Sequence, residues 1–354
     1  MTATIEDVAA PTSPHRLQFE LPPDLEASVP PEARGVTRDA VRLMVAYKSD
    51  GHLVHGNFNE LPRFLDAGDL VVVNTSGTLA AALDATAPND EQLGVHLSTQ
   101  LPAGLWVVEL RQRDHPFRDA HAGWKLQLPA SGEVELLAPY GESNGRLWVA
   151  VLRLLDPLLT YLAVHGQPIR YGYVRGSWPI SMYQNVYANE PGSAEMPSAG
   201  RPFTPEVITR LVAKGVGIAP LVLHTGVSSL ESYESPYAEY YRVPAHTSHL
   251  VNDTHRQGGR VIAIGTTVVR SLETVADERG HVHPGEGWTE TVITPERGVY
   301  AVDGLLTGWH EPEASHLDML EAIAGRPLVE RSYDAALAES YLWHEFGDVH
   351  LILP

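Results

Sequence analysis

Polar and small residues follow three of the apolar runs that the sequence predicts to be buried strands. His224-Thr225-Gly226 follows residues 216–223, Gly265-Thr266-Thr267 follows residues 260–264, and Asp303 follows residues 299–302. Ligands of parallel α/β sheets gather beyond the carboxyl ends of the strands, so these side chains are expected to meet at one edge. Imidazole and carboxylate groups can transfer protons there, while hydroxyls and backbone amides can hold an anion.

The turn Gly265–Thr267 has the firmest physical basis for ligand binding. A glycine lets a ligand approach the backbone, two hydroxyls can donate, and the N-terminus of the following helix attracts an anion such as a carboxylate. That helix carries Arg270 and Glu273. The alternative is a strand–helix turn capped by threonines, with Arg270 and Glu273 as a surface pair three residues apart. The turn matches neither the Walker phosphate loop nor the dinucleotide-binding glycine fingerprint.

His224 is a candidate general base or a donor that orients a ligand. The alternative is a packed, hydrogen-bonded histidine at the end of a strand. Thr307 and His310 follow Asp303 and extend the same region. The other closely spaced histidines match no zinc or iron pattern, and the chain has no cysteine, so we expect no metal site.

A segment rich in aromatic residues covers residues 171–187 and includes Tyr183 and Tyr187. Such rings can stack on a purine, or they can form the apolar boundary between two domains. Small residues follow in Pro197-Ser198-Ala199-Gly200, and they allow a ligand to lie against the backbone. Both segments are therefore candidate parts of a binding site.

Short strands separated by turn residues dominate residues 77–177. Apolar stretches at 105–110, 124–128, 133–138 and 146–154 are separated by clusters of Asp, Gly, Pro, Ser and Asn. Regularly spaced short strands with such turns favour a small antiparallel β-barrel. Residues 1–40 are rich in proline and are expected to form an extended arm on the surface.

Helices alternate with buried strands from about residue 183 onward. Thr204-Pro205-Glu206 is a helix start, and that helix ends at Gly215 before the strand 216–223. A second helix over 247–257 precedes the strand 260–264, and a third begins near Val268. Successive helix–strand units of this kind predict parallel pairing with crossover helices. Further strands are expected over 42–47, 69–74 and 349–353, with a helix over 58–67.

These patterns together predict an α/β fold. We expect a mainly parallel sheet with flanking helices, formed by residues 1–76 and 178–354. A small antiparallel β-barrel domain, residues 77–177, is expected to be inserted into it.

The composition limits the class of protein. The chain has 354 residues, 25 Lys+Arg against 44 Asp+Glu, and a net charge of -19, and its length suggests two domains. Residues 1–10 lack the features of a signal peptide, and no stretch would favour a bilayer, so we expect a cytoplasmic protein without a membrane partner. The scarcity of lysine and the absence of a basic run weaken the case for a nucleic-acid partner, although a fold can concentrate positive charge in one cleft.

Several blocks of the sequence, in order, resemble one known family. The first blocks are Tyr183-Gln184-Asn185-Val186-Tyr187-Ala188, Glu190-Pro191-Gly192-Ser193, Pro197-Ser198-Ala199-Gly200 and Phe203-Thr204. The later blocks are residues 223–226, 258–273, 287–289, 303–307 and 346–348. Together they resemble the S-adenosylmethionine:tRNA ribosyltransferase-isomerases of queuosine biosynthesis, strongly over about 183–353 and more weakly over 19–83.

The resemblance implies a reaction and a co-substrate. In the family, the ribosyl group of S-adenosylmethionine is transferred to a 7-aminomethyl-7-deazaguanine base in tRNA and isomerised, which gives epoxyqueuosine and releases adenine and methionine. A sulfonium acidifies the neighbouring C5′ protons, so one well-placed base can start this reaction. The resemblance implies no cofactor beyond S-adenosylmethionine itself.

The resemblance also implies roles for individual residues. The turn Gly265–Thr267 with Arg270 suits the methionine carboxylate or the ribose, and Tyr183, Gln184 and Tyr187 suit the adenine or the deazaguanine. The catalytic candidates are His224, Asp303, His310 and Glu239. The remaining expected substrate-binding residues are Pro197, Ser198, Ala199, Gly200, Gly226, Glu273 and Thr307.

The chain departs from the family at several basic and histidine positions. Gly77 and Ala82 stand where the family carries arginines, and Arg201-Pro202 stands where it has Leu-His. The loop after His224 is shortened over residues 227–230, and Glu239 alone remains of a Met-His-Ser-Glu motif. These departures and the acidic charge count against tRNA as a partner.

Three hypotheses therefore stand side by side. The chain is the family enzyme acting on tRNA, or a diverged paralogue that consumes S-adenosylmethionine with a small-molecule acceptor or none, or a binding protein without catalysis. Release of adenine and methionine with and without tRNA distinguishes them. The sequence predicts no particular oligomeric state.

Overall fold

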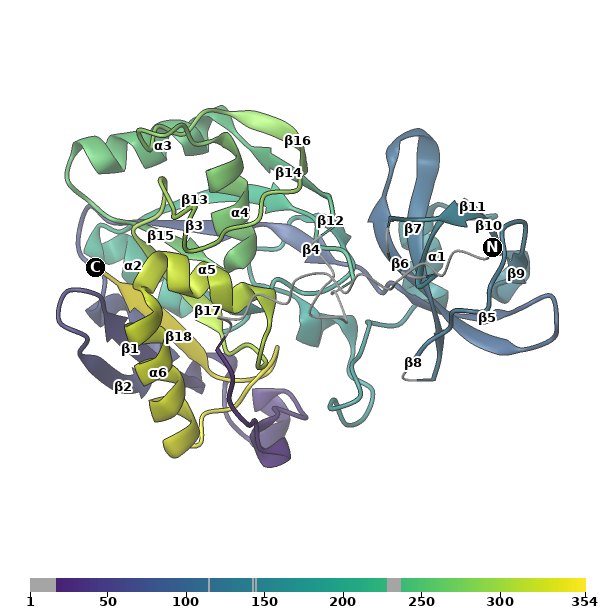
Figure 1. The fold of residues 1–354 in the computed structure, drawn as a ribbon, viewed down its shortest axis with the longest axis horizontal. Coiled ribbons are helices and arrows are strands. Elements are labelled where there is room, and N and C mark those ends of the chain that lie inside the picture. Colours follow the sequence, from purple (N-terminus) through teal and green to yellow (C-terminus); the bar gives the residue numbers. More distant parts are fainter. Residues whose placement is uncertain (1–16, 114, 142, 144, 228–236) are drawn as a thin grey trace, which may run out of the picture.

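The protein has two parts, a sheet covered by helices and a separate β-barrel (Figure 1). The computed structural model describes residues 17–113, 115–141, 143, 145–227 and 237–354. The first 16 residues of the predicted N-terminal arm and most of the predicted shortened loop, 228–230, lie outside the described residues.

The larger part is built on a nine-stranded sheet with the order β16-β14-β13-β3-β15-β17-β18-β1-β2. Its strands are β1 (Arg42–Tyr47), β2 (Leu53–Asn57), β3 (Leu70–Asn74), β13 (Gly217–Leu223), β14 (Glu239–Val243), β15 (Val261–Ile264), β16 (Gly285–Thr289), β17 (Gly304–Gly308) and β18 (Val349–Leu353). Adjacent strands β13, β3, β15 and β17 run parallel, as do β18 and β1. The other four pairings are antiparallel.

The prediction of a mainly parallel sheet is therefore corrected to a mixed sheet. The helix–strand repeats seen in the sequence identify the four central parallel strands correctly. An antiparallel pair arises between β1 and β2, where a short connection without a helix joins the strands. The pairing of β13 with β14 is antiparallel as well. Strand β18 returns antiparallel to β17 after two consecutive helices, a reversal that no local pattern marks.

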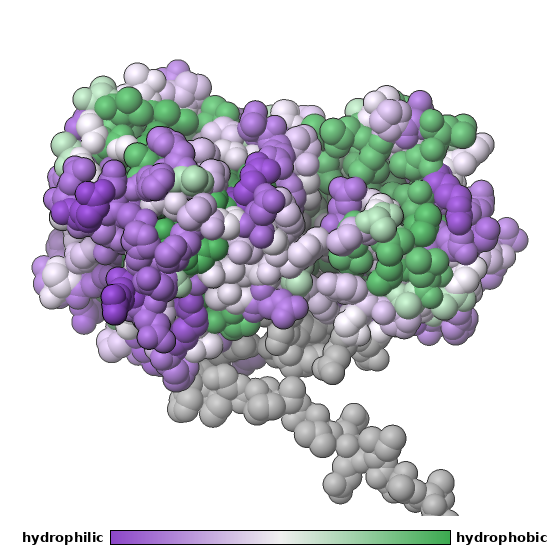
Figure 2. Space-filling view, turned by 90° about the horizontal axis from the view of Figure 1, so that it is seen from above, coloured by the Kyte–Doolittle hydropathy of each residue, from purple (hydrophilic) through white to green (hydrophobic). Residues whose placement is uncertain are grey.

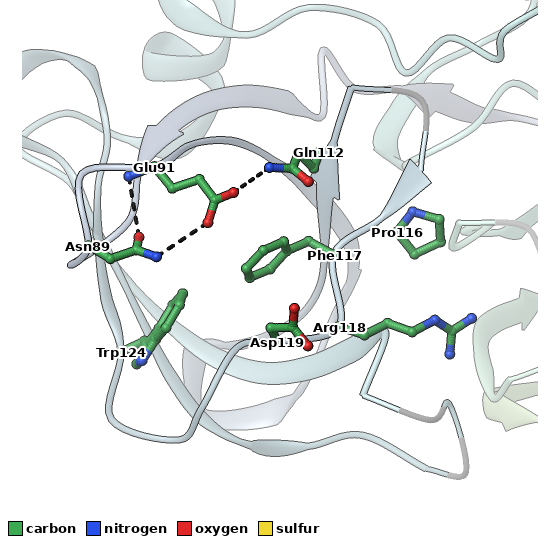
Figure 3. Close-up of a pocket in the computed structure, with 8 residues that line it drawn as sticks. All are labelled: Asn89, Glu91, Gln112, Pro116, Phe117, Arg118, Asp119 and Trp124. Carbon is green, nitrogen blue, oxygen red and sulfur yellow. Dashed lines mark hydrogen bonds between the residues drawn. The ribbon is translucent and has the colours of Figure 1, made fainter.

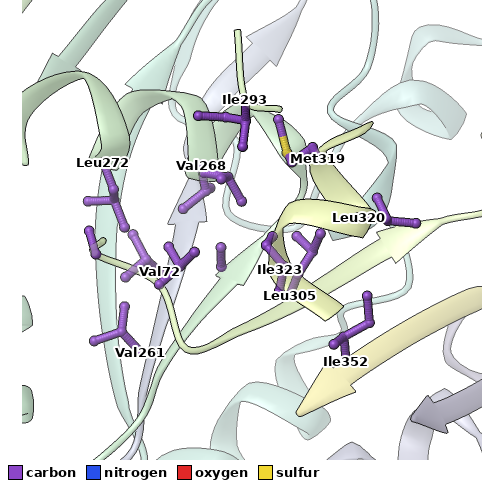
Figure 4. Packing of buried hydrophobic residues seen from close by; sticks show 14 of the residues in the cluster. Val72, Val261, Val268, Leu272, Ile293, Leu305, Met319, Leu320, Ile323 and Ile352 are labelled. Carbon is purple, nitrogen blue, oxygen red and sulfur yellow. The ribbon is translucent and has the colours of Figure 1, made fainter. Parts of the chain in front are cut away.

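Helices cover both faces of this sheet. Helices α3 (Ala245–Arg256), α4 (Thr266–Val275), α5 (Ser315–Ala324) and α6 (Arg326–Ala338) share one apolar core with the sheet. Figure 4 shows Val72, Val261 and Leu305 of the sheet beside Val268 and Leu272 of α4 and Leu320 of α5. Helix α2 (Pro205–Lys214) and the 3-10 helix η4 (Phe58–Arg63) pack on the opposite face.

The start of α2 shows how the sequence defines an element. Thr204 caps the helix by accepting a hydrogen bond from the amide of Val207 at 3.3 Å, and Pro205 occupies the first turn. Gly215 ends it with φ of +91°, a conformation that favours glycine. The predicted boundaries of this helix are confirmed.

The smaller part is a closed barrel of six antiparallel strands, which confirms the predicted small antiparallel β-barrel. They are β5 (Ala82–Thr86), β6 (Gln92–Gln100), β7 (Leu105–Gln112), β9 (Lys125–Gln127), β10 (Glu133–Pro139) and β11 (Leu147–Arg153), and the pairing of β11 with β7 closes the ring. Strand β8 (His115–Pro116) pairs with the end of β7, and helix α1 (Leu158–His165) follows β11. Figure 2 shows apolar side chains gathered over the barrel end, while much of the α/β end is hydrophilic.

Two short strands connect the parts. Strand β4 (Ser76–Thr78) precedes the barrel in the chain and β12 (Glu190–Ser193) follows it, and they pair in parallel with each other. The boundaries 76/77 and 177/178 that we expect for the inserted domain stay a prediction.

Two predicted elements differ from the structure. The strand expected over 299–302 is wrong, because the strand is β17 and begins only at Gly304. The helix expected over 58–67 is the shorter 3-10 helix η4, which contains Pro62. No helix in the described part of the chain is long and apolar enough to span a membrane.

Candidate active site

Asn74, at the carboxyl end of β3, ties together the ends of the central strands. Its Nδ2 donates to the carbonyl oxygen of Leu223 at 2.8 Å and to Oγ1 of Thr267 at 3.3 Å. Its Oδ1 accepts from the amides of Leu223 and Ser76, each at 3.0 Å. A single buried amide thus fixes the end of β13, the start of β4 and the first turn of α4.

His224 follows β13, and its side chain contacts residues of both connecting strands, β4 and β12. Its Nδ1 is 2.7 Å from Oγ of Ser76, and Gly192 lies so close that a Cβ there would be 2.4 Å from the imidazole. The ring stacks on Tyr240 with a centroid distance of 5.7 Å and an angle of 22°. On the other side, Nε2 is 3.9 Å from Oε1 of Glu190.

The charge state of His224 follows from this environment. Burial lowers the pKa of His224 below its ordinary value, Glu190 opposes that change and Arg242 adds to it. Arg242 and Glu190 form a bidentate ion pair beside the ring. His224 is therefore a neutral imidazole near pH 7.

Glu239, on β14, joins the loop after His224 to helix α4. One carboxylate oxygen accepts the amide hydrogen of Gly226 at 3.0 Å, and the other is paired with Arg270. Arg270 also donates to the carbonyl oxygens of Thr291 at 3.1 Å and Thr289 at 3.2 Å. Both members of the pair are largely buried, with side-chain exposures of 11% for Arg270 and 14% for Glu239.

The turn Gly265–Thr267 joins β15 to α4 at the same edge. Gly265 has φ of +90°, which favours glycine, and its amide donates to the carbonyl oxygen of Leu306 at 2.8 Å. A Cβ at this position would be 3.4 Å from Cβ of Ala199, in the 3-10 helix η8 (Ser198–Gly200). The amides of Val268 and Val269 donate to the carbonyl oxygen of Gly265 at 3.1 and 3.4 Å, so an anion at this helix end would be received by the amides of Thr266 and Thr267.

Thr307 and His310 complete the edge beyond β17. Oγ1 of Thr307 is 2.9 Å from Nε2 of His310, whose ring stacks on His316 at 4.5 Å with an angle of 2°. Burial is the first cause that lowers the pKa of His310 well below its ordinary value, and the neighbouring His316 contributes. This histidine pair is therefore neutral near pH 7.

Asp303 does not join the other catalytic candidates. It precedes β17, so it lies at the amino ends of β15 and β17, where its Oδ2 accepts from the amide of Val261 at 2.8 Å and lies 3.0 Å from Nε2 of His255. Burial acts to raise the pKa of Asp303, but these contacts outweigh it and hold the pKa below its ordinary value. Asp303 is therefore at the opposite end of the sheet from the candidate site.

Glu273 also serves the fold. Its buried carboxylate accepts hydrogen bonds from the amides of Tyr300 and Ala301 and pairs with Arg297 at 3.1 Å. These contacts use both carboxylate oxygens and fix the chain ahead of β17.

The predicted binding residues of the aromatic segment have structural contacts. Gln184 exchanges two hydrogen bonds with the backbone of Thr78, and Tyr183 packs against Phe346.

Tyr187 packs edge-on against Phe203, and its hydroxyl occupies the space where Gly200 has no side chain. Burial raises the pKa of Tyr183 to about 12. Pro197 accepts a hydrogen bond from Asn185, next to Ser198, Ala199 and Gly200.

Sequence reasoning missed several residues that surround His224. Asn74, Ser76 and Ser193 are buried polar side chains, and Glu190 and Arg242 form the adjacent ion pair. Glu190 and Ser193 belong to the block Glu190-Pro191-Gly192-Ser193 that resembles the family, and this was the signal for them in the sequence. His316 was not singled out by the sequence either, and its stacking on His310 brings it to this edge.

The barrel meets the sheet at this edge. The amide of Val227 donates to Oγ of Ser98 on β6 at 3.0 Å, and a Cβ on Gly226 would be 3.0 Å from Oγ1 of Thr99. The candidate site therefore lies where the inserted barrel joins the carboxyl ends of the central strands.

Two cavities lie away from this edge. One of about 430 Å³ in the barrel is lined by Asn89, Glu91, Gln112, Pro116, Phe117, Arg118, Asp119 and Trp124 (Figure 3). The other, of about 310 Å³, lies where α1 meets the chain that returns from the barrel, and its lining includes Leu162, Gln167 and Trp178. Among the described residues, no group of three or more His, Cys, Asp or Glu side chains is arranged to hold a metal ion.

The fold and the site define an α/β protein with a β-barrel and with a candidate ligand site at the carboxyl edge of a mixed sheet. Comparison with known proteins makes this class specific. Residues 15–352 match the family described as queuosine biosynthesis protein, and the chain belongs to that family.

Individual relatives cover nearly the whole chain. A protein of Moorella thermoacetica named S-adenosylmethionine:tRNA ribosyltransferase-isomerase is 34% identical over 353 residues, which is 95% of this chain and 98% of the relative. A protein of the same name from Thermus thermophilus is 35% identical over 351 residues, with the same coverage. The crystal structure of S-adenosylmethionine tRNA ribosyltransferase from Thermotoga maritima matches with a TM-score of 0.53 and 29% identity, over 95% of this chain and 99% of that one.

Proposed function

We propose that the protein is an S-adenosylmethionine-dependent ribosyltransferase-isomerase that acts on 7-aminomethyl-7-deazaguanine in tRNA and forms epoxyqueuosine. The observation that carries this proposal is the similarity, over 95% of the chain, to relatives that bear that enzyme's name. The side chains and backbone amides at the carboxyl ends of β13, β15 and β17 include groups that can transfer a proton and groups that can bind an anion.

S-Adenosylmethionine fits the edge as follows. Its methionine carboxylate lies against the turn Gly265–Thr267, where the amides and hydroxyls at the start of α4 favour an anion. Arg270, whose donors are engaged by Glu239 and two carbonyl oxygens, holds the neighbouring loop and adds positive potential. The small side chain of Ala199 lies beside Gly265 and keeps this turn uncrowded for the nucleoside, whereas the space beside Gly200 is filled by Tyr187.

The groups for proton transfer surround the same edge. His224, His310 and Glu239 remain the catalytic candidates, and the two imidazoles are neutral near pH 7. The deazaguanine enters between the sheet and the barrel, next to Gly226 and Thr99. Thr307 orients His310 through its hydroxyl.

A protein with an acidic overall composition can still have a local basic surface. Arg170 and Arg175 are exposed on the segment that returns from the barrel to the sheet. In the proposed complex they contact phosphates, which would attract tRNA to an otherwise negative protein. Arg201 does not contribute, because it is buried and paired with Glu32.

The test is incubation of the protein with S-adenosylmethionine, with and without tRNA that carries 7-aminomethyl-7-deazaguanine, followed by mass spectrometry of adenine, methionine and the tRNA. We expect release of both products only with this tRNA, together with epoxyqueuosine in it. Release without tRNA would contradict the proposed acceptor, and binding of S-adenosylmethionine without turnover would contradict catalysis.

Gly192 gives a prediction that depends on the position of His224. Replacement by alanine places a Cβ 2.4 Å from the imidazole and must displace the ring. Because a shift of about 1 Å in a reacting group can cost about 100-fold, we expect Gly192→Ala to lower the turnover rate by about that factor. Turnover of S-adenosylmethionine with tRNA, measured as product per minute, checks this.

The matched control is Gly94→Ala on β6, because the atom nearest to a Cβ at Gly94 would be 3.7 Å away, an ordinary van der Waals distance. This variant should retain the wild-type rate. Equal rates for the two variants would contradict the position assigned to His224.

A further inference from the structure

A chain of hydrogen bonds leads from the backbone to the ring of His224. The amide of Thr225 donates to Oγ of Ser193 at 3.0 Å, Oγ of Ser193 is 2.6 Å from Oγ of Ser76, and Oγ of Ser76 is 2.7 Å from Nδ1 of His224. Ser193 and Ser76 have exposures of 0% and 1%. Water therefore does not compete for these hydroxyls.

The hydrogen atoms in this chain can be assigned by counting donors. A backbone amide only donates, and each serine hydroxyl has one hydrogen to donate. If Ser193 donates to Ser76 and Ser76 donates to the imidazole, every hydrogen has an acceptor. In the reverse order, the buried hydroxyl hydrogen of Ser193 has no acceptor within the part of the chain that the structure describes. Buried donors without acceptors are rare and costly, so the first order is favoured.

We infer that Nδ1 of His224 accepts a hydrogen bond and that His224 therefore carries its proton on Nε2. Ser76 and Ser193 are positioning residues that fix this tautomer. The Nε2–H group faces Glu190, 3.9 Å away, and stays available to a ligand at the sheet edge. Stacking on Tyr240 and contact with Gly192 hold the ring in this orientation.

This assignment changes what His224 can do in the reaction, and that part rests on the proposed function. A nitrogen that already carries a proton cannot remove one from C5′ of S-adenosylmethionine. His224 instead donates a hydrogen bond from Nε2 to an oxygen or nitrogen of the substrate that gains negative charge. The general base is then another group at this edge of the sheet. Of the candidates named above, His310 and Glu239 remain for that role.

The first experiment reads the tautomer directly in the free protein. Long-range proton–nitrogen NMR spectra of protein labelled with nitrogen-15 in histidine distinguish protonated from unprotonated ring nitrogens, and the spectrum of His224→Gln assigns the signals. At pH 7.5 we expect Nε2 protonated and Nδ1 unprotonated. A signal pattern with the proton on Nδ1 would overturn the inference. This result does not depend on turnover, so it stands even if the proposed function fails.

The serine variants test the cause. Ser76→Thr keeps a hydroxyl and should keep the Nε2–H tautomer, whereas Ser76→Ala removes the donor and should give a mixture of both tautomers. An unchanged tautomer in Ser76→Ala would overturn the role of the serines. Circular dichroism of both variants confirms that they are folded.

The second experiment separates a donor from a base at position 224. The side-chain amide of His224→Gln supplies an N–H near the position of Nε2, so this variant should turn over S-adenosylmethionine at least 10-fold faster than His224→Ala. Removal of a general base typically costs about 10²–10⁴-fold, and an amide cannot replace one. Equal rates for the glutamine and alanine variants would overturn the donor role while leaving the tautomer assignment to the NMR result.

Discussion

Replacing either Glu239 or Arg270 by glutamine is expected to lower the free energy of unfolding by about 3 kcal/mol, because each change leaves a largely buried charge without its partner. The pair joins β14 to α4, and Glu239 also receives the amide hydrogen of Gly226. The double variant Glu239→Gln/Arg270→Gln should lose less than the sum of the single losses, since it leaves no unpaired charge. Urea denaturation of the three variants measures these values.

The matched control for the arginine change is Arg256→Gln. Arg256 pairs with Asp253 three residues earlier on α3, but the two side chains are 71% and 45% exposed. Exposed ion pairs contribute about 0–1 kcal/mol, so this variant should differ little from the wild type. A loss for Arg270→Gln no larger than that of Arg256→Gln would contradict the importance of the buried pair.

The same pair should matter for the proposed activity. Without Glu239 the amide of Gly226 loses its acceptor, and the loop that carries His224 is held less firmly beside the barrel. Glu239→Gln keeps an oxygen that can accept this hydrogen bond, whereas Glu239→Ala does not. We therefore expect a lower turnover rate for the alanine variant than for the glutamine variant at a temperature where both are folded.

Acidification from pH 7.5 to pH 5 is expected to lower the free energy of unfolding by about 4 kcal/mol through two buried histidines. Burial lowers the pKa of His344 to about 4 and that of His350 to about 3, and they are 7% and 0% exposed. In the unfolded chain both would have an ordinary value of about 6.5.

The sign follows from proton binding. Between pH 6.5 and about 4 the unfolded chain binds protons at these histidines and the folded protein does not, so acid favours unfolding. Each histidine contributes about 1.4 kcal/mol per pH unit, or about 2 kcal/mol at pH 5. The stabilisation is complete above the unfolded value and declines as the pH falls towards the folded values.

His350→Phe isolates one of the two contributions. His350 stacks on Trp309 at 4.8 Å, and neither of its ring nitrogens has a hydrogen-bond partner among the described residues. Phenylalanine preserves the aromatic contact and cannot bind a proton, so the loss between pH 7.5 and pH 5 should shrink by about 2 kcal/mol. Urea midpoints of both proteins at the two pH values measure this, and an unchanged loss would contradict the assignment.

Local patterns in the sequence predicted much of the fold. The valine-rich strand β3, the capped helix α2 and the turn at Gly265 follow from residues that are close in the chain. The places of β18 beside β17 and of β14 beside β16 depend on packing between distant segments. The start of β17 was misplaced by several residues, and that error moved Asp303 to the wrong end of the sheet.

In the candidate site, too, residues close to strand ends could be predicted, whereas contacts between distant segments could not. His224, Gly226 and Gly265 were predicted at one edge from the rule that ligands gather where parallel strands end, and the structure brings them there. Thr307 and His310 were placed there as followers of a strand over 299–302, and they reach this edge because β17 ends at Gly308. The hydrogen bond between Ser76 and Ser193 joins residues 117 positions apart, so no spacing in the sequence could indicate it. Glu273 could not be distinguished from a ligand-binding residue, because its partners Tyr300 and Ala301 are backbone amides of a distant loop.

The parallel pairing of β4 with β12 joins the two chain segments that lead into and out of the barrel. Each segment carries one of the two serines beside His224. The hydrogen-bonded path to the ring of His224 therefore exists only where the two ends of the inserted domain lie side by side. The pairing that closes the insertion also completes the surroundings of His224.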